Sequence, residues 1–319
     1  MQKSRRTRFR VVFMGTPEFA VPSLKGLIQG PDEIAAVVSQ PDRPRGRGRK
    51  LVPTPVKEVA LDAGLRVMQP RRVREPEFLD EIRAISPDLI LVAAFGQILP
   101  QELLDIPGIM PMNVHGSLLP AYRGAAPIQW ALINGDEKTG ITIMRIDAGM
   151  DTGPMLLKRE LAIGEDETFG TLMPRMAKLG AEALMDALDL LEKGKLKEQP
   201  QPEEGVTYAP PIKKEQLHID WSQPTRMIHG TIRAFDPRPG AWTMMNEERT
   251  RLFSPFFVRI PRPEGAVPGQ VLEADKRGML VAAGDGVLGI AELQRPGKKR
   301  LAVGQFLMGR KVVPGTVLE

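Results

Sequence analysis

An asparagine and a histidine, Asn113 and His115, stand two residues apart in the stretch "MNVHGSLLPAYRG", and the chain has only three histidines. If the apolar residues before them form a strand, both side chains point to the same face of that strand. An amide and an imidazole placed side by side can hold a developing oxyanion, and a histidine can also move a proton near neutral pH. The structural alternative is a histidine that only caps a loop.

A glycine-rich stretch further along the chain, "RIDAGMDTGPM", supplies two carboxylates, Asp147 and Asp151. Loop carboxylates are most often solvated or cap turns, so neither predicts a function by itself. An aspartate beside His115 could stabilise a charged imidazole and accept a proton from an amine. With Asn113, this set favours acyl transfer to a nitrogen without a covalent intermediate, because the chain offers no cysteine and no serine elbow.

The first half of the chain has the alternating pattern that would position these residues. Apolar, β-rich runs alternate with helix-like patches, which predicts a parallel sheet covered by helices on both faces. The expected strands cover residues 10–15, 34–40, 65–69, 88–96 and 108–116, and the expected helices cover 17–28, 55–64, 77–86 and 99–106. Thr16 and Pro17 predict the N-cap and first residue of the first helix. Ligands of open α/β sheets bind beyond the carboxyl ends of the strands, where Asn113 and His115 would lie.

The second half changes character after a helical pattern over residues 168–194. Residues 193–209 are rich in Pro, Glu and Gln without an apolar period, which is linker composition. Residues 210–319 contain short strand-like runs, the last at 303–307, separated by Gly, Asp and Pro. This pattern predicts a small antiparallel barrel or sandwich. Gly284–Gly289 match a dinucleotide-binding pattern as a string, but strand-like sequence follows, so a hairpin turn is the better prediction.

Composition limits the classes of protein that fit. The chain has 319 residues, 42% of them apolar, and no cysteine, which predicts a globular protein of two domains without disulfides or thiolate metal sites. Three scattered histidines make a zinc site a poor prediction, so we expect no metal. No apolar run is long enough for a transmembrane helix. The basic first ten residues lack a following signal-peptide core, although a short organellar presequence is an alternative.

Charge is unevenly distributed along the chain. Residues 1–50 carry 11 basic and 4 acidic groups, residues 210–319 carry 17 and 11, and the middle carries 16 and 24. Basic ends indicate a polyanion held at two places, the alternative being uneven solvation of a large surface. The stretch "PDRPRGRGRK" is too polar and broken for a helix, and we expect a mobile basic loop. Its cations, which could bind phosphates, are Arg43, Arg45, Arg47, Arg49 and Lys50.

The stretches "NVHGSLLPAYRG" and "DAGMDTGPML" closely resemble the formyltransferases that use 10-formyltetrahydrofolate. The resemblance implies that Asn113, His115 and Asp151 form the catalytic set. It also implies a folate site for the formyl donor. The residues of that site would be Ser117, Leu118, Leu119, Pro120, Gln97, Ile98, Leu99 and Asp147.

Two further stretches, "MGTPEFAVPSL" and "SQPDRPRGRGRKLVPTPVK", resemble the members of this family that act on initiator methionyl-tRNA. The resemblance implies a Rossmann-like catalytic domain (1–192), a linker (193–209) and an OB-like tRNA-binding domain (210–319). It places the basic stretch against the acceptor arm of the tRNA, where binding should weaken steeply with salt. Phe19 would help to receive the methionine side chain. We expect a monomer in the bacterial cytoplasm that does not bind membranes.

Three alternatives share parts of this pattern. A folate formyltransferase acting on a small amine would have the same catalytic set but would not need the arginine-rich stretch or a basic second domain. A related hydrolase would release formate without an acceptor. A non-catalytic RNA-binding protein would use the basic ends but would bind no folate.

Overall fold

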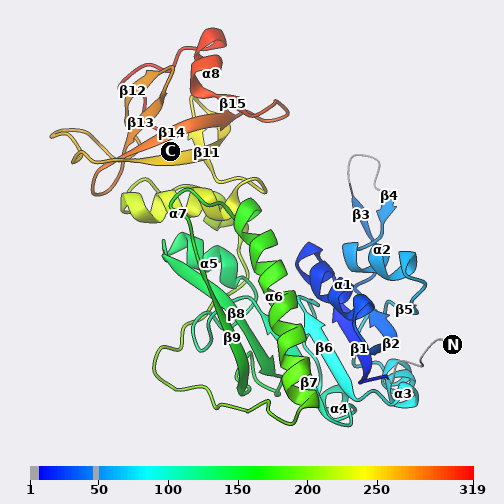
Figure 1. Ribbon diagram of the computed structural model, residues 1–319. Helices are drawn as coiled ribbons and strands as arrows, with labels where there is room; N and C mark the ends of the chain where they lie inside the picture. Colours follow the sequence, from blue (N-terminus) through cyan, green and yellow to red (C-terminus); the bar gives the residue numbers. More distant parts are fainter. Residues whose placement is uncertain (1–6, 46–49) are drawn as a thin grey trace. The chain divides into compact units, whose positions relative to one another are not determined.

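The computed structural model describes residues 7–45 and 50–319 (Figure 1). Contacts between residues divide the chain into two compact units, and each is described by itself. The first unit comprises Met1–Gly124, Gly140–Leu161 and Met173–Tyr208, and the second comprises Ala125–Thr139, Ala162–Leu172 and Ala209–Glu319. The second unit therefore includes two short segments, Ala125–Thr139 and Ala162–Leu172, in addition to its C-terminal part.

A largely parallel sheet forms the centre of the first unit. Within the described residues it has seven strands in the order β5-β2-β1-β6-β7-β8-β9. These strands are β1 (Arg10–Gly15), β2 (Glu33–Val38), β5 (Val67–Met68), β6 (Leu89–Ala93), β7 (Met110–His115), β8 (Lys138–Arg145) and β9 (Met155–Ala162). The pairs from β5 to β7 are parallel, whereas β7 and β8 are antiparallel. The prediction of a parallel sheet is confirmed, and β7 is its last parallel strand.

Helices cover both faces of this sheet, as expected for apolar strands without polar alternation. The helical segments are η1 (Glu18–Ala20), α1 (Val21–Gln29), α2 (Pro55–Asp62), α3 (Pro76–Ile85), α4 (Gln101–Leu104) and most of α6 (Phe169–Glu192). On one face, Val12 and Ile90 pack in a buried cluster with Phe78 and Ile82 of α3. Neighbouring residues along the strands point to the opposite face.

Helix α6 approaches that opposite face closely because of a glycine. A Cβ atom on Gly180 would lie 2.8 Å from Cγ1 of Val114, so a larger residue would push the helix away from β7. Since Val114 faces α6, the flanking Asn113 and His115 point to the other face of the sheet. The strand therefore presents both polar side chains together.

Two local predictions in the first unit are wrong. The basic stretch is not irregular throughout, because β3 (Arg43–Arg45) and β4 (Lys50–Val52) pair as antiparallel strands. The first α-helix begins at Val21 rather than at Pro17. Thr16 does not cap it, since its hydroxyl donates a hydrogen bond of 2.8 Å to the Phe95 carbonyl, just beyond β6.

The second unit is built on an antiparallel sheet. Its described part has six strands in the order β10-β11-β14-β13-β12, with β15 paired to β14. These strands are β10 (Trp242–Met245), β11 (Glu248–Val258), β12 (Val271–Asp275), β13 (Gly278–Ala282), β14 (Val287–Gln294) and β15 (Leu301–Ala302). The helical segments are α5 (Pro127–Ile133), η2 (Lys214–Leu217), α7 (Thr225–Phe235) and α8 (Val303–Gly309). The strand predicted at 303–307 is wrong, because that segment belongs to α8.

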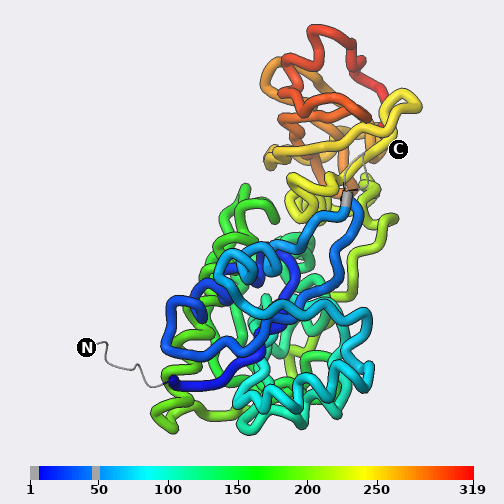
Figure 2. The backbone as a smooth tube through the Cα atoms, turned by 90° about the vertical axis from the view of Figure 1, so that its right-hand side faces the viewer, coloured from blue at the N-terminus to red at the C-terminus, as the bar shows by residue number. Residues whose placement is uncertain are grey.

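The end of the chain closes this sheet into a small barrel. The amide of Val271 in β12 donates to the Thr316 carbonyl at 2.7 Å, and Met244 in β10 exchanges two backbone hydrogen bonds with Glu319. The last residues thus pair with both edge strands, as the barrel prediction requires. Figure 2 shows these yellow-to-red segments gathered into one curled body.

The glycine-rich string at Gly284–Gly289 forms part of a hairpin, as predicted. Strands β13 and β14 pair antiparallel, with β14 beginning at Val287 inside the string, and the Ala283 amide donates to the Gly286 carbonyl at 2.8 Å. A helix, which dinucleotide binding would need after the glycines, does not follow. Among the described residues, no helix is both long and apolar enough to cross a bilayer.

Candidate active site

His115 ends strand β7 and is 4% exposed. Its Nε2 atom lies 3.0 Å from the Tyr122 carbonyl oxygen. Because a carbonyl only accepts, this contact requires a proton on Nε2. The other ring nitrogen, Nδ1, lies 3.6 Å from Oδ2 of Asp151. Both nitrogens of this imidazole therefore face an oxygen acceptor.

Asp151 reaches His115 from the loop between β8 and β9. Its Oδ2 atom accepts a hydrogen bond of 2.8 Å from the amide of Gly124. The side chain remains 20% exposed, so it lies at the rim of the site. Its backbone has a φ of +53°, in the left-handed region that residues with a Cβ adopt at a cost. The structure thus brings together two side chains that are 36 positions apart in the printed sequence.

Asn113 lies half-buried on the same face of β7 as His115. Within the described part of the chain, its side-chain amide makes no hydrogen bond. The amide of Asn113 can therefore donate to a ligand without breaking an existing bond. An uncommitted donor beside a histidine and an aspartate is an arrangement suited to a developing oxyanion.

The predicted folate stretch from Ser117 to Pro120 forms a tightly bonded turn after β7. The Ser117 hydroxyl donates to the Ala121 carbonyl at 2.6 Å, and the Ser117 carbonyl accepts from Thr142 at 2.7 Å. Ser117 and Leu119 are fully buried, and Leu119 packs against two methionines. Leu118 and Pro120 are half-buried. Contact of the Leu119 side chain with a ligand would require this core to open.

The predicted pterin-lining residues follow β6. The Gln97 side chain accepts from the Val73 amide at 3.0 Å and donates to the Arg71 carbonyl at 3.3 Å, so it fixes a neighbouring turn. Leu99 packs against the buried cluster, whereas Ile98 is 92% exposed. A large apolar side chain so exposed is available to a ligand.

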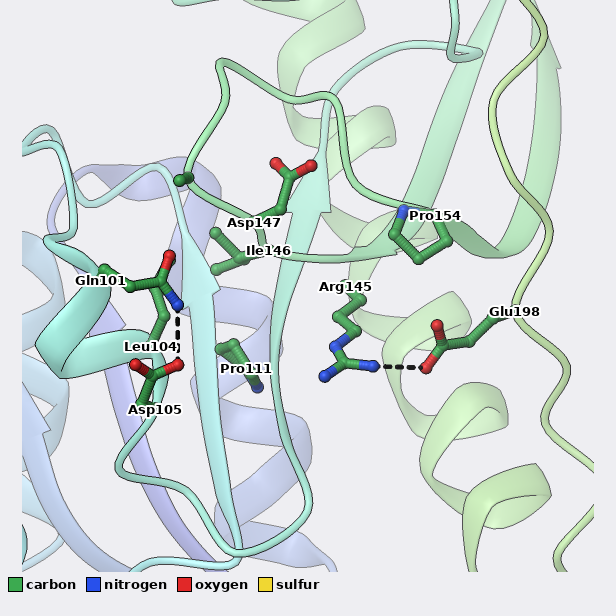
Figure 3. A pocket seen from close by; sticks show the side chains of 10 residues that line it. Gln101, Leu104, Asp105, Pro111, Arg145, Ile146, Asp147, Pro154 and Glu198 are labelled. Atoms are coloured by element: carbon green, nitrogen blue, oxygen red, sulfur yellow. Dashed lines mark hydrogen bonds and ion pairs between the residues drawn. The ribbon is translucent and has the colours of Figure 1, made fainter.

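A pocket of about 280 Å³ lies between α4, the start of β7 and the end of β8 (Figure 3), whereas His115 is at the other end of β7. Its lining residues are Gln101, Leu104, Asp105, Pro111, Arg145, Ile146, Asp147, Ala148, Pro154 and Glu198. Of the predicted folate residues, only Asp147 lines it. The other lining residues were not predicted from the sequence, among them Arg145 and Glu198, which form an ion pair of 3.1 Å. No local pattern marks that pair, since its partners are far apart in the sequence.

Asp147 also organises its own loop. Its carboxylate accepts from the Thr152 hydroxyl at 2.8 Å and from the Gly149 amide at 3.2 Å. At Gly153, a Cβ atom would lie 2.0 Å from the Arg145 carbonyl oxygen. The loop can fold back against the end of β8 only with glycine at this position.

The basic hairpin is anchored at its base. Lys57 donates to Asp42 at 2.7 Å, and this bond together with one from Gln69 lowers the pKa of Asp42 below its ordinary value. Arg43 is exposed at the start of β3. The predicted contacts Arg47 and Arg49 lie outside the described residues, and of Arg45 and Lys50 only the backbone is described.

Two other predicted features concern ligands. Phe19 lies half-buried in η1, directly after β1. Across residues 7–45 and 50–319, no three His, Asp or Glu side chains come together in a way that could hold a metal ion.

The parallel sheet, the barrel and the His-Asp contact are compatible with a group transferase, and two family models identify the class. A model described as formyl transferase matches residues 8–188, and one described as formyl transferase, C-terminal domain, matches residues 211–311. The chain belongs to the formyl transferase family.

Its relatives narrow the class further. The chain is 50% identical to a methionyl-tRNA formyltransferase of Geobacter sulfurreducens over 97% of this chain and 96% of that protein. It is 51% identical to one of Pelobacter propionicus over 97% and 95%. Among solved structures, the sugar 3N-formyl transferase WlaRD, crystallised with dTDP and 5-N-formyl-THF, superposes with a TM-score of 0.65. That match has 19% identity over 92% of this chain and 100% of that one, and it supports the fold alone.

Proposed function

We propose that this enzyme transfers the formyl group of 10-formyltetrahydrofolate to the α-amine of methionine on initiator methionyl-tRNA. The observation that carries the proposal is the contact of Asp151 with His115 beside the uncommitted amide of Asn113. Full-length relatives named methionyl-tRNA formyltransferase support the same substrate pair.

In the proposed reaction, the methionine amine attacks the formyl carbon and a new C–N bond forms. The Asn113 amide donates to the oxyanion, and a protonated His115 would supply positive charge beside it, with its two ring nitrogens facing the Tyr122 carbonyl and Asp151. Asp151 helps to remove the amine proton, either directly or through water. The bond between the formyl carbon and N10 of the folate then breaks, and N10 leaves with a proton.

The pocket beside Asp147 is proposed to receive one end of the folate. At about 280 Å³ it is near the lower limit of small-molecule sites, so it would enclose part of the donor rather than all of it. Exposed Ile98 and Met150 would add apolar contacts, since they are 92% and 64% exposed. The remaining predicted contacts would come from Gln97, Leu99 and residues 117–120.

The tRNA is proposed to bind at two places. One is the basic segment formed by Arg43, Arg45, Arg47, Arg49 and Lys50, and the other is the basic region 210–319. Arginine recognises phosphate through paired hydrogen bonds, and such contacts position the nucleic acid without reading its sequence. Half-buried Phe19 would receive the methionine side chain.

We propose the division into a catalytic domain (1–192), a linker (193–209) and an OB-like domain (210–319). The ranges of the two family models, 8–188 and 211–311, support it. We further propose that the enzyme acts as a monomer in the bacterial cytoplasm, consistent with its bacterial relatives. Light scattering of the purified chain tests the monomer.

The central experiment measures formyl transfer from labelled 10-formyltetrahydrofolate. Initiator and elongator methionyl-tRNA, free methionine and a small sugar amine serve as acceptors in parallel. We expect transfer to the initiator tRNA only. Efficient transfer to the sugar amine would favour a small-molecule formyltransferase, and formate release without an acceptor would favour a hydrolase.

Single variants then test the roles of the site residues. Asn113→Ala, His115→Ala and Asp151→Ala should each lower kcat by about 10²–10³, the usual cost of one such donor or its partner. Binding of the tRNA should change little, because these side chains do not lie in the basic segments. Asp62→Ala is the matched control, since Asp62 is exposed at the end of α2. Near-normal turnover in any two of the three site variants would overturn the assignment.

A further inference from the structure

The segment from Gln199 to Thr207 has linker composition but is bonded into the first unit. Gln199 exchanges two backbone hydrogen bonds with Met155, of 2.8 and 2.9 Å. Eight residues later, the Thr207 carbonyl accepts from the Arg123 amide at 2.9 Å. Between these two attachments, the chain passes both loops that contact His115.

Gln201 uses its side chain to join those two loops. Its Nε2 atom donates to the carbonyls of Asp151, at 2.7 Å, and Gly153, at 2.8 Å. Its Oε1 atom accepts from Nε and Nη2 of Arg123, at 3.0 and 2.7 Å. Carbonyls only accept and a guanidinium only donates, so the orientation of this amide is fixed by its partners. The side chain is half-buried and makes four hydrogen bonds.

Thr207 supports the second loop in a similar way. Its hydroxyl accepts from the Tyr122 amide at 2.8 Å, and the Tyr122 carbonyl in turn faces Nε2 of His115 at 3.0 Å. Tyr122 has a φ of +62° and Asp151 a φ of +53°. Backbones in this region persist only where the surroundings hold them. Gln201 bonds to the carbonyl of Asp151, and Thr207 bonds to the amide of Tyr122.

We infer that Gln201 is a positioning residue for the transfer reaction. It holds the Asp151 loop and the Arg123 loop at a fixed separation, and thereby sets the distance of Asp151 from His115. In this role Gln201 acts through Asp151 and not on the reacting atoms. This inference rests on the proposed function for its activity readout, but the bonding network itself does not depend on the substrate.

Gln201→Ala removes all four hydrogen bonds and should lower kcat by about 10- to 100-fold, since a misplacement of about 1 Å can cost as much. The KM for methionyl-tRNA should stay within about twofold, because the basic segments are untouched. Gln201→Glu keeps an acceptor for Arg123 but places an oxygen against two carbonyls. It should be at least as impaired as Gln201→Ala if the bonds to the Asp151 loop are the important ones.

Gln199→Ala is the matched control. Gln199 is exposed in the same segment, and within the described residues its side chain makes no hydrogen bond. Its kcat should equal that of the wild type. Gln201→Ala should also have no further effect in an Asp151→Ala background, because a residue that acts through Asp151 loses its role when that carboxylate is gone. Full additivity there, or a normal kcat in Gln201→Ala, would overturn the inference.

Hydrogen exchange separates this inference from the proposed function. In full-length Gln201→Ala, the amides of residues 147–153 should exchange faster than in Gln199→Ala, while those of β6 and β7 stay unchanged. Unchanged exchange in the loop would overturn the positioning role. If the wild type fails to formylate the tRNA, the proposed function is wrong, and the exchange experiment still decides whether Gln201 holds the loop.

Discussion

We predict that the second unit loses stability in acid because of the buried His229. It lies in α7, is 1% exposed, and its ring stacks on Phe257 with 4.1 Å between centroids. Burial and the nearby charge of Arg233 lower the pKa of His229 from 6.5 to about 4, and the Pro255 carbonyl offsets only part of this. The folded state therefore holds the ring neutral over a range in which the unfolded chain protonates it.

The sign and size of the effect follow from these two pKa values. Well above pH 6.5 neither state binds the proton, so His229 then adds no pH dependence to the free energy of unfolding. Between pH 6.5 and 4 the unfolded state binds more protons, and the free energy of unfolding falls as the pH is lowered. The expected loss is about 2 kcal/mol at pH 5 and about 3 kcal/mol at pH 4, since one pKa unit corresponds to about 1.4 kcal/mol.

Tryptophan fluorescence reports on the unfolding of the second unit. All three tryptophans, Trp130, Trp221 and Trp242, belong to the second unit. Urea unfolding should therefore be followed by their emission at pH 8, 7, 6 and 5. His229→Phe retains an aromatic ring on Phe257 but cannot titrate. Between pH 7 and pH 5, its free energy of unfolding should therefore fall by about 2 kcal/mol less than that of the wild type. Between pH 7 and 8 the difference between the two proteins should be constant.

This reasoning would be refuted if, below pH 6.5, the free energy of unfolding depended on pH equally in the wild type and in His229→Phe. That result would mean that the ring is solvated or protonated in the folded state. Carboxylates such as Glu292 also lower the stability in acid, because Ser254 and Arg300 lower the pKa of Glu292 against the effect of burial. This loss of stability is common to both proteins and cancels in the comparison.

Two further variants test packing and charge. Gly153→Ala should lower kcat by about 10-fold or more, because its Cβ would meet the Arg145 carbonyl at 2.0 Å and displace the Asp151 loop; a steady-state assay checks this. Arg300→Met should destabilise the second unit by about 1–3 kcal/mol in the urea experiment, because Asp236, 4% exposed and bonded to Arg300 at 2.8 Å, would lose its charged partner.

The central geometry of the site was accessible from the sequence because it follows from short-range rules. A spacing of two on a strand places Asn113 and His115 on one face, and an apolar run followed by a turn marks the carboxyl end of β7. Buried strands of a parallel sheet are also continuous apolar runs, so β1, β6 and β7 were predicted from composition.

Two local rules failed where tertiary contacts prevailed. Thr16 and Pro17 look like a helix start, but the Thr16 hydroxyl bonds to the Phe95 carbonyl and so joins the ends of two strands. The segment 303–307 reads as a strand because it is short and apolar. In the structure it buries Val303 and Phe306, three residues apart, which is a helical period. Runs of this length do not distinguish the two periods.

The bonding of residues 199–207 shows a different limit. No hydrophobic period marks this segment, because its attachments are polar side chains and backbone bridges to distant residues. Such bonds carry no sequence pattern, so the composition of the segment predicts a linker. That the segment is held against the first unit is known only once its hydrogen-bond partners are known.

The candidate active site therefore depends on residues 199–207 in addition to strand β7 and the two loops that contact His115. Strand β7 supplies Asn113 and His115, but the sheet alone provides neither acceptor for the imidazole. Those acceptors come from loops with left-handed residues, and residues 199–207 bond to both loops. A fragment that ended at residue 192 would keep the sheet and the proposed catalytic side chains but would lose the hydrogen bonds from residues 199–207 to both loops. The proposed linker (193–209) is therefore not a free connection, because most of it is bonded into the first unit, which ends at Tyr208.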